Sequence, residues 1–594
     1  MRLNRESVLS LLPPLGVFAA ACALFAVGVT NDHLSMDDWG YIYGCPFVRD
    51  GLTWRNVWQA FTVLGYDAFW MPLTYVSYMC DITLLGGGWP VHHAVNVALH
   101  GANAVLAWML ARRCLAGRGG RLADVACALG VLVWALHPMR AEAVTYVASR
   151  KELLWSLFAL GGLLVWWRFL DAGRRRDYGL AWICCVLACL SKPTAVCFPL
   201  LAYIVEAIRA RRLWNGRLLR YVPFLVVSCL VGLLTLHVQA HPIDHEQLDV
   251  FGETFGWRLL NAAVGLGMHI WHTIRMSDIH FDYRAVFGGR PLNLTDGLGM
   301  LMTAVVGLYA CARALRRRRG AVLLILLAAA WAVVALLPVS GVLGTVNGDH
   351  AYADRYTYLP FVGVALPLCL LLTLALRQHL VPTLLVVVGV LAVECVQSVA
   401  VIRSFRNDYT AFSRTLAHDP EHWRALRIVG NEYCARLGRT DEGVEMLRRS
   451  LRLRSSQHTA ESLAYILAVR GQEGDFREVR ELCRGVMQDT RRDRLGMMLD
   501  ALGIVALREG DDTQAVRYLA ASLRAPGRNY SNSHTMLNLA LALANSGRKQ
   551  EAANYLMKLA RSPDAGIRRR GQQTLEALRR GNDGKRFEWC ATPF

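Results

Sequence analysis

Charged residues are scarce in this chain. Asp, Glu, Lys and Arg together make up 19% of its 594 residues, whereas 54% of the residues are hydrophobic. A soluble domain has about 25% charged residues, so the chain is too apolar to be soluble throughout. This composition excludes a secreted enzyme and a disordered scaffold. It predicts several domains, at least one of them in a membrane.

Lysine is scarcer still, with only five among the 65 basic residues. The formal net charge is +19, but the arginines lie between long apolar runs and form no continuous basic patch. This distribution is typical of a polytopic membrane protein, whose cytoplasmic loops are basic. It excludes nucleic acid as a partner. The bias toward arginine is typical of a GC-rich bacterial genome.

Several motifs that would carry familiar chemistry are absent. The sequence has no glycine-rich phosphate loop, no GxSxG and no CxxC or HExxH pattern, so neither ATP-driven chemistry nor a bound metal is expected. The energy for any reaction must then reside in the substrate. No cofactor is certain, and a divalent cation stays open. Cys45 and Cys80 share one predicted outer loop, where a disulfide is an open alternative.

Eleven apolar runs approach the length of about 20 residues that a membrane span requires. They lie at 7–30, 92–111, 122–138, 153–170, 178–191, 194–208, 221–240, 296–312, 321–340, 361–376 and 381–402. With the basic loops inside, the N-terminus is cytoplasmic and the outer loops are 31–91, 137–152, 241–295 and 341–360.

The segment Gly256–Ile274 is also apolar. A crossing there would place the basic run Arg316–Arg319 outside, against the charge rule. We therefore expect a re-entrant or interfacial helix at this position.

The sequence becomes polar after residue 403 and then repeats itself. Four similar segments turn at glycines spaced 36, 36 and 37 residues apart, namely Gly438, Gly474, Gly510 and Gly547. Such a rhythm is typical of tetratricopeptide repeats. A solenoid of this kind either is purely structural or exposes a binding groove, and both readings stay open.

The predicted fold is therefore all-α. A polytopic membrane domain of about 11 spans, with additional interfacial or re-entrant helices, occupies residues 1–403. A tetratricopeptide-repeat solenoid of about four repeats occupies 404–581, outside the cytoplasm, and 582–594 form a tail.

Two adjacent carboxylates, Asp37 and Asp38, follow the first span directly in HLSMDDWGYIY. Neighbouring side chains point apart, so the pair does not fit a glycosidase couple, whose carboxyl groups flank one bond at about 5–9.5 Å. One catalytic base with a second carboxylate that orients it fits better. A solvated helix end is the alternative.

Cations gather on the predicted outer face, where the charge rule disfavours them. The segment HPMRAEAVTYVASRKE holds three of them close to an acid, and guanidinium groups bind phosphate with paired hydrogen bonds. The predicted phosphate ligands are Arg140, Arg150, Lys151, Lys192 and Arg355. Further candidates are His137, Glu142, His93 and Tyr356. Internal salt bridges, a snorkelling lysine and interfacial tyrosine anchors are the alternatives.

A polar stripe also follows one predicted span, at His92, Asn96, His100 and Asn103. Polar packing between helices explains such a stripe. Because His93 and His100 are seven residues apart, a metal site is poorly supported there, and none is predicted.

In this order, the segments resemble bacterial relatives of the transmembrane and tetratricopeptide-repeat-containing O-mannosyltransferases, which belong to the GT-C class of polytopic glycosyltransferases. The resemblance rests on MDDWGYIY, LHPMRAEAVTYVASRKELLWSLF, LSKPTAVCFPL and ADRYTYLPFVG, with repeats last. It implies a polyprenyl- or dolichyl-phosphate sugar as donor. It also implies an active-site acidic pair in the first outer loop, which corresponds to Asp37 and Asp38.

Together these features predict a membrane glycosyltransferase. It would transfer a hexose or pentose with inversion to an acceptor hydroxyl, on a protein serine or threonine, at the extracytoplasmic face. Asp37 would be the base and Asp38 its partner, and the repeats would bind the acceptor protein. The predicted location is the bacterial inner membrane, or the ER membrane in a eukaryote. The alternatives are a non-catalytic repeat scaffold for envelope assembly and a transporter of lipid-linked saccharides.

Overall fold

The structure is a computed structural model of the chain. It describes residues 5–64, 66, 69–115, 120–213, 217–239, 255–283, 319–342, 352–488, 495–525, 532–562, 565–580 and 587. These residues form α-helices, short 3-10 helices and connections, without a β-strand among them, which confirms the predicted all-α class. The chain divides into two compact units, Met1–Arg414 and Thr415–Phe594. The division falls in α18 (Asp408–His418), eleven residues after the boundary predicted at residue 403.

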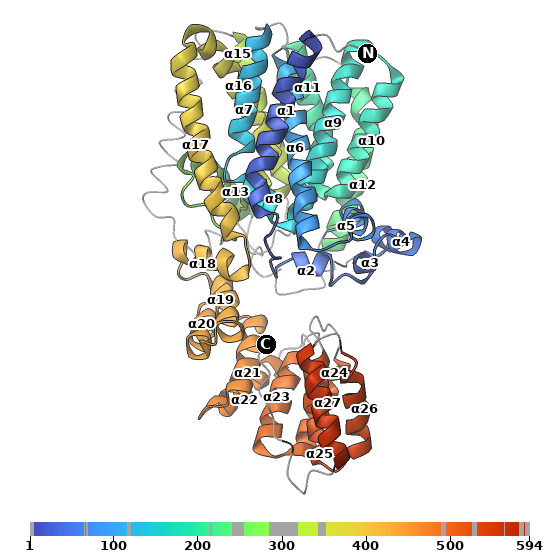
Figure 1. The fold of residues 1–594 in the computed structure, drawn as a ribbon. Helices are drawn as coiled ribbons and strands as arrows, with labels where there is room; N and C mark the ends of the chain where they lie inside the picture. Colours follow the sequence, from blue (N-terminus) through green and yellow to red (C-terminus); the bar gives the residue numbers. More distant parts are fainter. Residues whose placement is uncertain are drawn as a thin grey trace. The chain divides into compact units, whose positions relative to one another are not determined.

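Seven helical segments of the described residues are long and apolar enough to cross a membrane (Figure 1). They contain α6 (Trp89–Cys114), α9 (Arg150–Ala172), α11 (Phe198–Ala210), α12 (Val222–Gln239), α15 (Arg319–Leu336), α16 (Pro360–Gln378) and α17 (Leu380–Ser404). Each coincides with a predicted span. The first unit is therefore an integral membrane protein.

Three other predicted spans coincide with α1 (Arg5–Phe25), α7 (Gly120–Ala135) and α10 (Arg175–Ser191). The last two have 16 and 17 residues, and all three pack against the longer helices. The run 296–312 and the basic residues 316–318 lie outside the described residues, as do 241–254, 284–295 and the tail 582–594 apart from residue 587.

The composition of the spans explains why they stay helical in lipid. The segment Val322–Val339 has a mean hydropathy of 2.8 and Leu380–Ser404 of 2.4, and a helix satisfies its own backbone hydrogen bonds where water is absent. Large apolar side chains such as Leu233 and Val396 face outward, with 65% and 70% of their surface exposed. These outward faces are suited to contact with lipid.

Short helices cap one end of this bundle. Figure 1 shows α2 to α5 at the end opposite the N-terminus, which we call the distal end. They are α2 (Asp38–Tyr41), α3 (Pro46–Arg49), α4 (Trp54–Thr62) and α5 (Pro72–Leu85). Cys45 and Cys80 are free thiols, so the disulfide left open by the sequence is not formed.

Helix α13 (Phe255–Arg275) covers the segment predicted as interfacial or re-entrant. It is not among the seven span candidates. Its side chains Met268 and His272 are buried, while Leu259 and Ile274 are more than half exposed. One face thus packs on the protein and the other is apolar and open, which agrees with an interfacial helix.

Helical hairpins make up the second unit. The helices are α19 (Trp423–Ala435), α20 (Thr440–Leu453), α21 (Gln457–Arg470), α22 (Asp475–Gln488), α23 (Leu495–Glu509), α24 (Asp512–Arg524), α25 (Asn532–Asn545), α26 (Lys549–Leu559) and α27 (Ala565–Arg580). The four predicted turn glycines lie between successive helices with φ from 64° to 93°. A residue without Cβ adopts this left-handed conformation at no steric cost.

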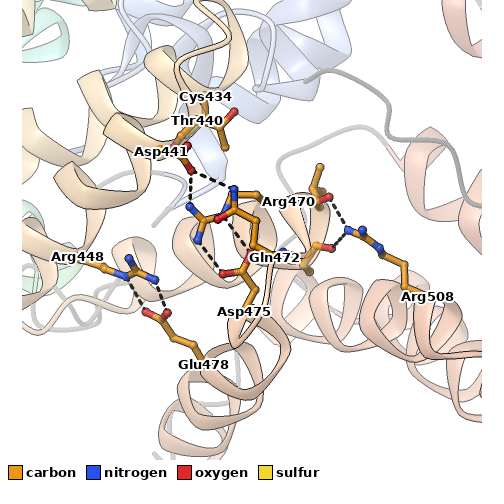
Figure 2. Close-up of polar contacts among 11 residues, drawn as sticks. Cys434, Thr440, Asp441, Arg448, Arg470, Gln472, Asp475, Glu478 and Arg508 are labelled. Carbon is orange, nitrogen blue, oxygen red and sulfur yellow. Dashed lines mark hydrogen bonds and ion pairs between the residues drawn. The ribbon is translucent and has the colours of Figure 1, made fainter.

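Arginines at helix ends join successive hairpins, as Figure 2 shows. Arg470 binds Asp441 at 2.8 Å and Asp475 at 2.7 Å, and so links the ends of three helices. Arg508 donates to the carbonyl oxygens of Ala468 and Val469. A Cβ on Gly471, whose φ is +63°, would lie only 2.1 Å from Arg508 Nη1. The left-handed backbone at the end of α21 therefore favours glycine, whose lack of a side chain leaves room for the Arg508 guanidinium.

Candidate active site

Asp38 is a buried anchor. Only 1% of it is exposed. Its carboxylate accepts backbone hydrogen bonds from Leu34 at 2.9 Å and from Ala148 at 2.7 Å. Burial raises the pKa of Asp38 to about 8, although both hydrogen bonds act in the opposite direction. The side chain therefore ties α2 to η2 (Val147–Ser149), and few of its lone pairs are left for a substrate.

Asp37 is placed differently. It is the residue before α2, its side chain caps no backbone N–H of that helix, and it is only partly buried. Its charge acts on Arg355 and on the hydroxyl of Tyr146. Burial first, and then the charge of Asp37, raise the pKa of Tyr146 well above its usual range. Asp37 is thus the carboxylate of the pair whose charge acts on Arg355.

Two predicted site residues, Glu142 and Arg355, form a buried ion pair. Glu142 belongs to α8 (Arg140–Thr145) and Arg355 to η7 (Asp354–Thr357). The carboxylate binds the guanidinium and also accepts the backbone N–H of Arg355 at 3.0 Å. The residues are 3% and 9% exposed. This double contact fixes both the position and the direction of Arg355.

Lys192 joins the same cluster from the junction of α10 and η3 (Pro193–Cys197). It forms a buried ion pair with Glu152. Its Nζ lies 5.2 Å from the ring centre of Tyr356, over which the guanidinium of Arg355 also lies, at 4.9 Å. Burial lowers the pKa of Lys192 to about 8, against the pull of Glu152. Both cations therefore lie against the ring of Tyr356.

Lys151 is the third cation of the cluster, and its charge is felt at Lys192. Its Nζ donates to the hydroxyl of Tyr41 at 2.9 Å and lies 4.7 Å from the centre of that ring. Within the described residues no carboxylate lies within ion-pair distance of Lys151, whereas Lys192 and Arg355 each have one. We call Asp37, Lys151, Lys192, Arg355 and Tyr356 the distal cluster.

Arg150, the neighbour of Lys151, points away from this cluster. Its guanidinium is fully buried and pairs with Asp81. It also donates to Asn96 Oδ1 and to the carbonyl oxygen of His92, both at 2.8 Å, and lies over the ring of Tyr78. These partners occupy its donors inside the helix bundle. The structure therefore places Arg150 in a packing role, and we leave it out of the proposed phosphate site.

Two other predicted site residues, His137 and His93, have hydrogen-bond partners outside the distal cluster. His137 accepts the backbone N–H of Met139 and lies 3.1 Å from the carbonyl oxygen of Thr273 in α13. His93 is 2% exposed on α6, with Nε2 3.4 Å from the carbonyl oxygen of Asp32. Both positions are explained by packing. Arg140, the remaining candidate, is also buried and is taken up below.

Three residues of the site were not predicted from the sequence: Tyr41, Tyr146 and Glu152. Tyr41 carries a signal in retrospect, because it follows Asp37 by four residues and so lies on the same face of one helical turn. Glu152 is separated from its partner Lys192 by 40 residues, and no local pattern indicates their contact.

Metal binding finds no support in the described parts of the chain, which contain no group of three or more His, Cys, Asp or Glu side chains arranged to hold an ion. The cluster instead offers one carboxylate base beside three fixed cations. Such an arrangement can deprotonate a hydroxyl and stabilise a leaving phosphate.

Comparison with known proteins agrees with the motif order. The chain is 24% identical to protein O-mannosyl-transferase TMTC4 of Mus musculus over 420 residues, which is 60% of this chain and 55% of the mouse protein. The chain thus spans about half the length of this curated relative. No family model matches the sequence, and no solved structure does. The chain is therefore related, at a distance, to the transmembrane and tetratricopeptide-repeat-containing O-mannosyltransferases, as its motifs predicted.

Proposed function

We propose that the protein is a membrane glycosyltransferase that moves a sugar from a polyprenyl phosphate to a hydroxyl group at the distal end of the bundle. The observation that carries this proposal is the distal cluster, in which Lys192 and Arg355 lie against the ring of Tyr356 and the charges of Asp37 and Lys151 act on these cations. The relation to an O-mannosyltransferase supports the same reaction class.

The reaction is a single displacement. Asp37 accepts the proton of the acceptor hydroxyl while the hydroxyl oxygen bonds to the anomeric carbon. The bond from that carbon to the phosphate oxygen breaks, and its electron pair leaves with the polyprenyl phosphate. Attack on the face opposite the leaving group inverts the anomeric centre. Lys151, Lys192 and Arg355 stabilise the charge that develops on the phosphate.

The charges within the cluster assign different tasks to the three cations. Glu142 and Glu152 already balance Arg355 and Lys192, so these two residues contribute oriented hydrogen bonds more than net charge. Lys151 has a hydroxyl partner instead. It therefore supplies the positive charge that attracts a phosphate.

The setting of the reaction follows from the sequence. We assign the distal end to the extracytoplasmic face of a bacterial inner membrane, or of the ER membrane in a eukaryote, because the basic loops belong inside. In the same proposal the hairpins of the second unit are tetratricopeptide repeats that present the acceptor protein.

The test compares single substitutions in a deletion strain. Asp37→Asn keeps the size of the side chain and removes the base, so sugar transfer should fall by about 100-fold or more. Asp50→Asn is the matched control, because Asp50 lies in the same loop but is exposed and pairs with its neighbour Arg49. The measurement is the intact mass of extracytoplasmic proteins, with membrane abundance of each variant followed in parallel.

The expected result is a sugar-sized mass that is present with wild type and Asp50→Asn and missing with Asp37→Asn. If Asp37→Asn restores both the masses and the strain's phenotype, the base assignment is wrong and a repeat scaffold becomes the better account. A sugar-linked lipid that changes sides without any protein mass change would instead favour a transporter.

A further inference from the structure

Arg140 was predicted to bind the donor phosphate, but it is enclosed by protein. It is 1% exposed, and the rings of Trp134, Tyr358 and Phe361 each lie 5.9 Å from its guanidinium carbon. Its Nη2 donates to the hydroxyl of Thr357. Among the described residues its Nε and Nη1 have no hydrogen-bond partner. Within the described residues, the hydrogen bond to Thr357 is therefore the one that holds the Arg140 guanidinium.

Thr357 is the last residue of η7, the short helix that carries Arg355. The contact with Arg140 therefore bears on the position of Arg355. The Thr357 hydroxyl accepts from Arg140 and donates to the carbonyl oxygen of Asp354 at 2.7 Å. One hydroxyl thus closes the turn of η7 and attaches that turn to α8.

The charge of Asp354, the first residue of η7, acts on Arg140 and raises its pKa against the larger effect of burial. Burial opposes its ionisation, but the contact with His272 and the hydrogen bond from Tyr283 hold the pKa of Asp354 below its usual range. Arg140 thus interacts with both ends of the four-residue turn.

Helix α8 holds η7 at two places, since Glu142 binds Arg355 and Arg140 binds Thr357. We propose that Arg140 is a positioning residue, which acts through Thr357 to hold η7 so that Arg355 and Tyr356 face the donor phosphate. This inference rests on the proposed function, because it assigns a task within the same site.

A direct phosphate ligand and a positioning residue respond differently to substitution of Thr357. Thr357→Val keeps the shape of the side chain and removes its hydroxyl, so the turn loses both contacts while Arg140 keeps its charge. Thr357→Ser keeps the hydroxyl. Thr373→Val is the matched control, because Thr373 is equally buried and its hydroxyl bonds only to the carbonyl oxygen of Cys369 in α16.

The experiment measures binding of undecaprenyl phosphate to the full-length protein in detergent, together with the melting temperature. We expect Thr357→Val to weaken binding roughly tenfold, because the position of Arg355 and Tyr356 depends on the two hydrogen bonds of that hydroxyl. Thr357→Ser and Thr373→Val should bind within about twofold of wild type. The melting temperatures of Thr357→Val and Thr373→Val should fall by similar amounts.

A double-mutant cycle completes the test, because residues that act through one contact are not additive. Arg140→Met and Thr357→Val should each weaken binding, and the double variant should lose no more than Arg140→Met alone. Wild-type binding with Thr357→Val, or additive losses in the double variant, would overturn the positioning role. If wild type itself fails to bind undecaprenyl phosphate, the proposed donor is wrong, and the inference fails with it.

Discussion

The two units use ion pairs between arginine and a carboxylate in opposite surroundings. In the membrane unit, the side chains of Arg150 and Asp81 are 0% and 4% exposed. In the repeat unit, Arg452 and Glu445 are each 62% exposed. Removing one partner of a buried pair leaves an uncompensated charge and costs about 3–5 kcal/mol. An exposed pair contributes about 0–1 kcal/mol.

This difference shows that the many arginines of the chain have different structural roles in the two units. In the repeat unit the arginines mostly keep a solvated surface soluble. In the membrane unit some arginines pack the bundle, Arg355 belongs to the distal cluster, and others such as Arg49 are exposed. The local burial of each side chain decides which.

The largest expected effect is at Arg150. Arg150→Met should lower the free energy of unfolding of the membrane unit by about 3–5 kcal/mol, because Asp81 would stay buried beside His92 without the charge of Arg150. Arg49→Met, at an exposed pair of the same unit, should change it by less than about 1 kcal/mol. Thermal unfolding in detergent measures both. A double change, Arg150→Met with Asp81→Leu, should recover much of the loss, and failure to do so would mean that packing and not charge dominates.

An intermediate effect is expected at Arg470, which is 12% exposed and binds two carboxylates. Arg470→Ala should destabilise the second unit by about 1–3 kcal/mol, since Asp475 is buried and loses its charged donor. Arg452→Ala is the control and should cost less than about 0.5 kcal/mol. Chemical denaturation, monitored by the helical signal in circular dichroism, measures the loss of stability in each variant. Equal effects of the two substitutions would contradict the distinction between buried and exposed pairs.

The smallest effect concerns Lys192 and pH. With a pKa of about 8, Lys192 loses its charge in the folded protein as pH rises past that value, so binding of undecaprenyl phosphate should weaken several-fold between about pH 7 and about pH 9.5. In the unfolded chain the same lysine keeps its proton up to about pH 10.4. Between about pH 8 and about pH 10.4 the unfolded state therefore binds more protons than the folded state, so the contribution of Lys192 to stability rises with pH. Lys192→Arg should remove most of the change in binding. A wild-type profile that matches this variant would contradict the assignment.

Much of the fold is predictable from the sequence, because the signals are local. A run of apolar residues specifies a span wherever it lies, and a glycine at a fixed interval specifies a turn. Thus α17 and the turn at Gly510 appear where hydropathy and spacing predict them.

The site is less predictable, because its contacts join distant segments. Glu142 and Arg355 are 213 residues apart, and only the packing of the bundle brings them together. Arg150 and Lys151 are neighbours on one helix, where consecutive side chains point about 100° apart. Sequence alone shows two adjacent cations and cannot tell which of them faces the cluster.

The closeness of Gly471 to Arg508 constrains how the repeats can change by successive mutations. A Cβ at position 471 collides with the guanidinium, whereas a shorter side chain at 508 leaves the glycine unharmed. The φ of +63° strains any other residue at 471 whatever stands at 508. Glycine therefore stays at this position, and 508 is the one of the two that engineered repeats can vary.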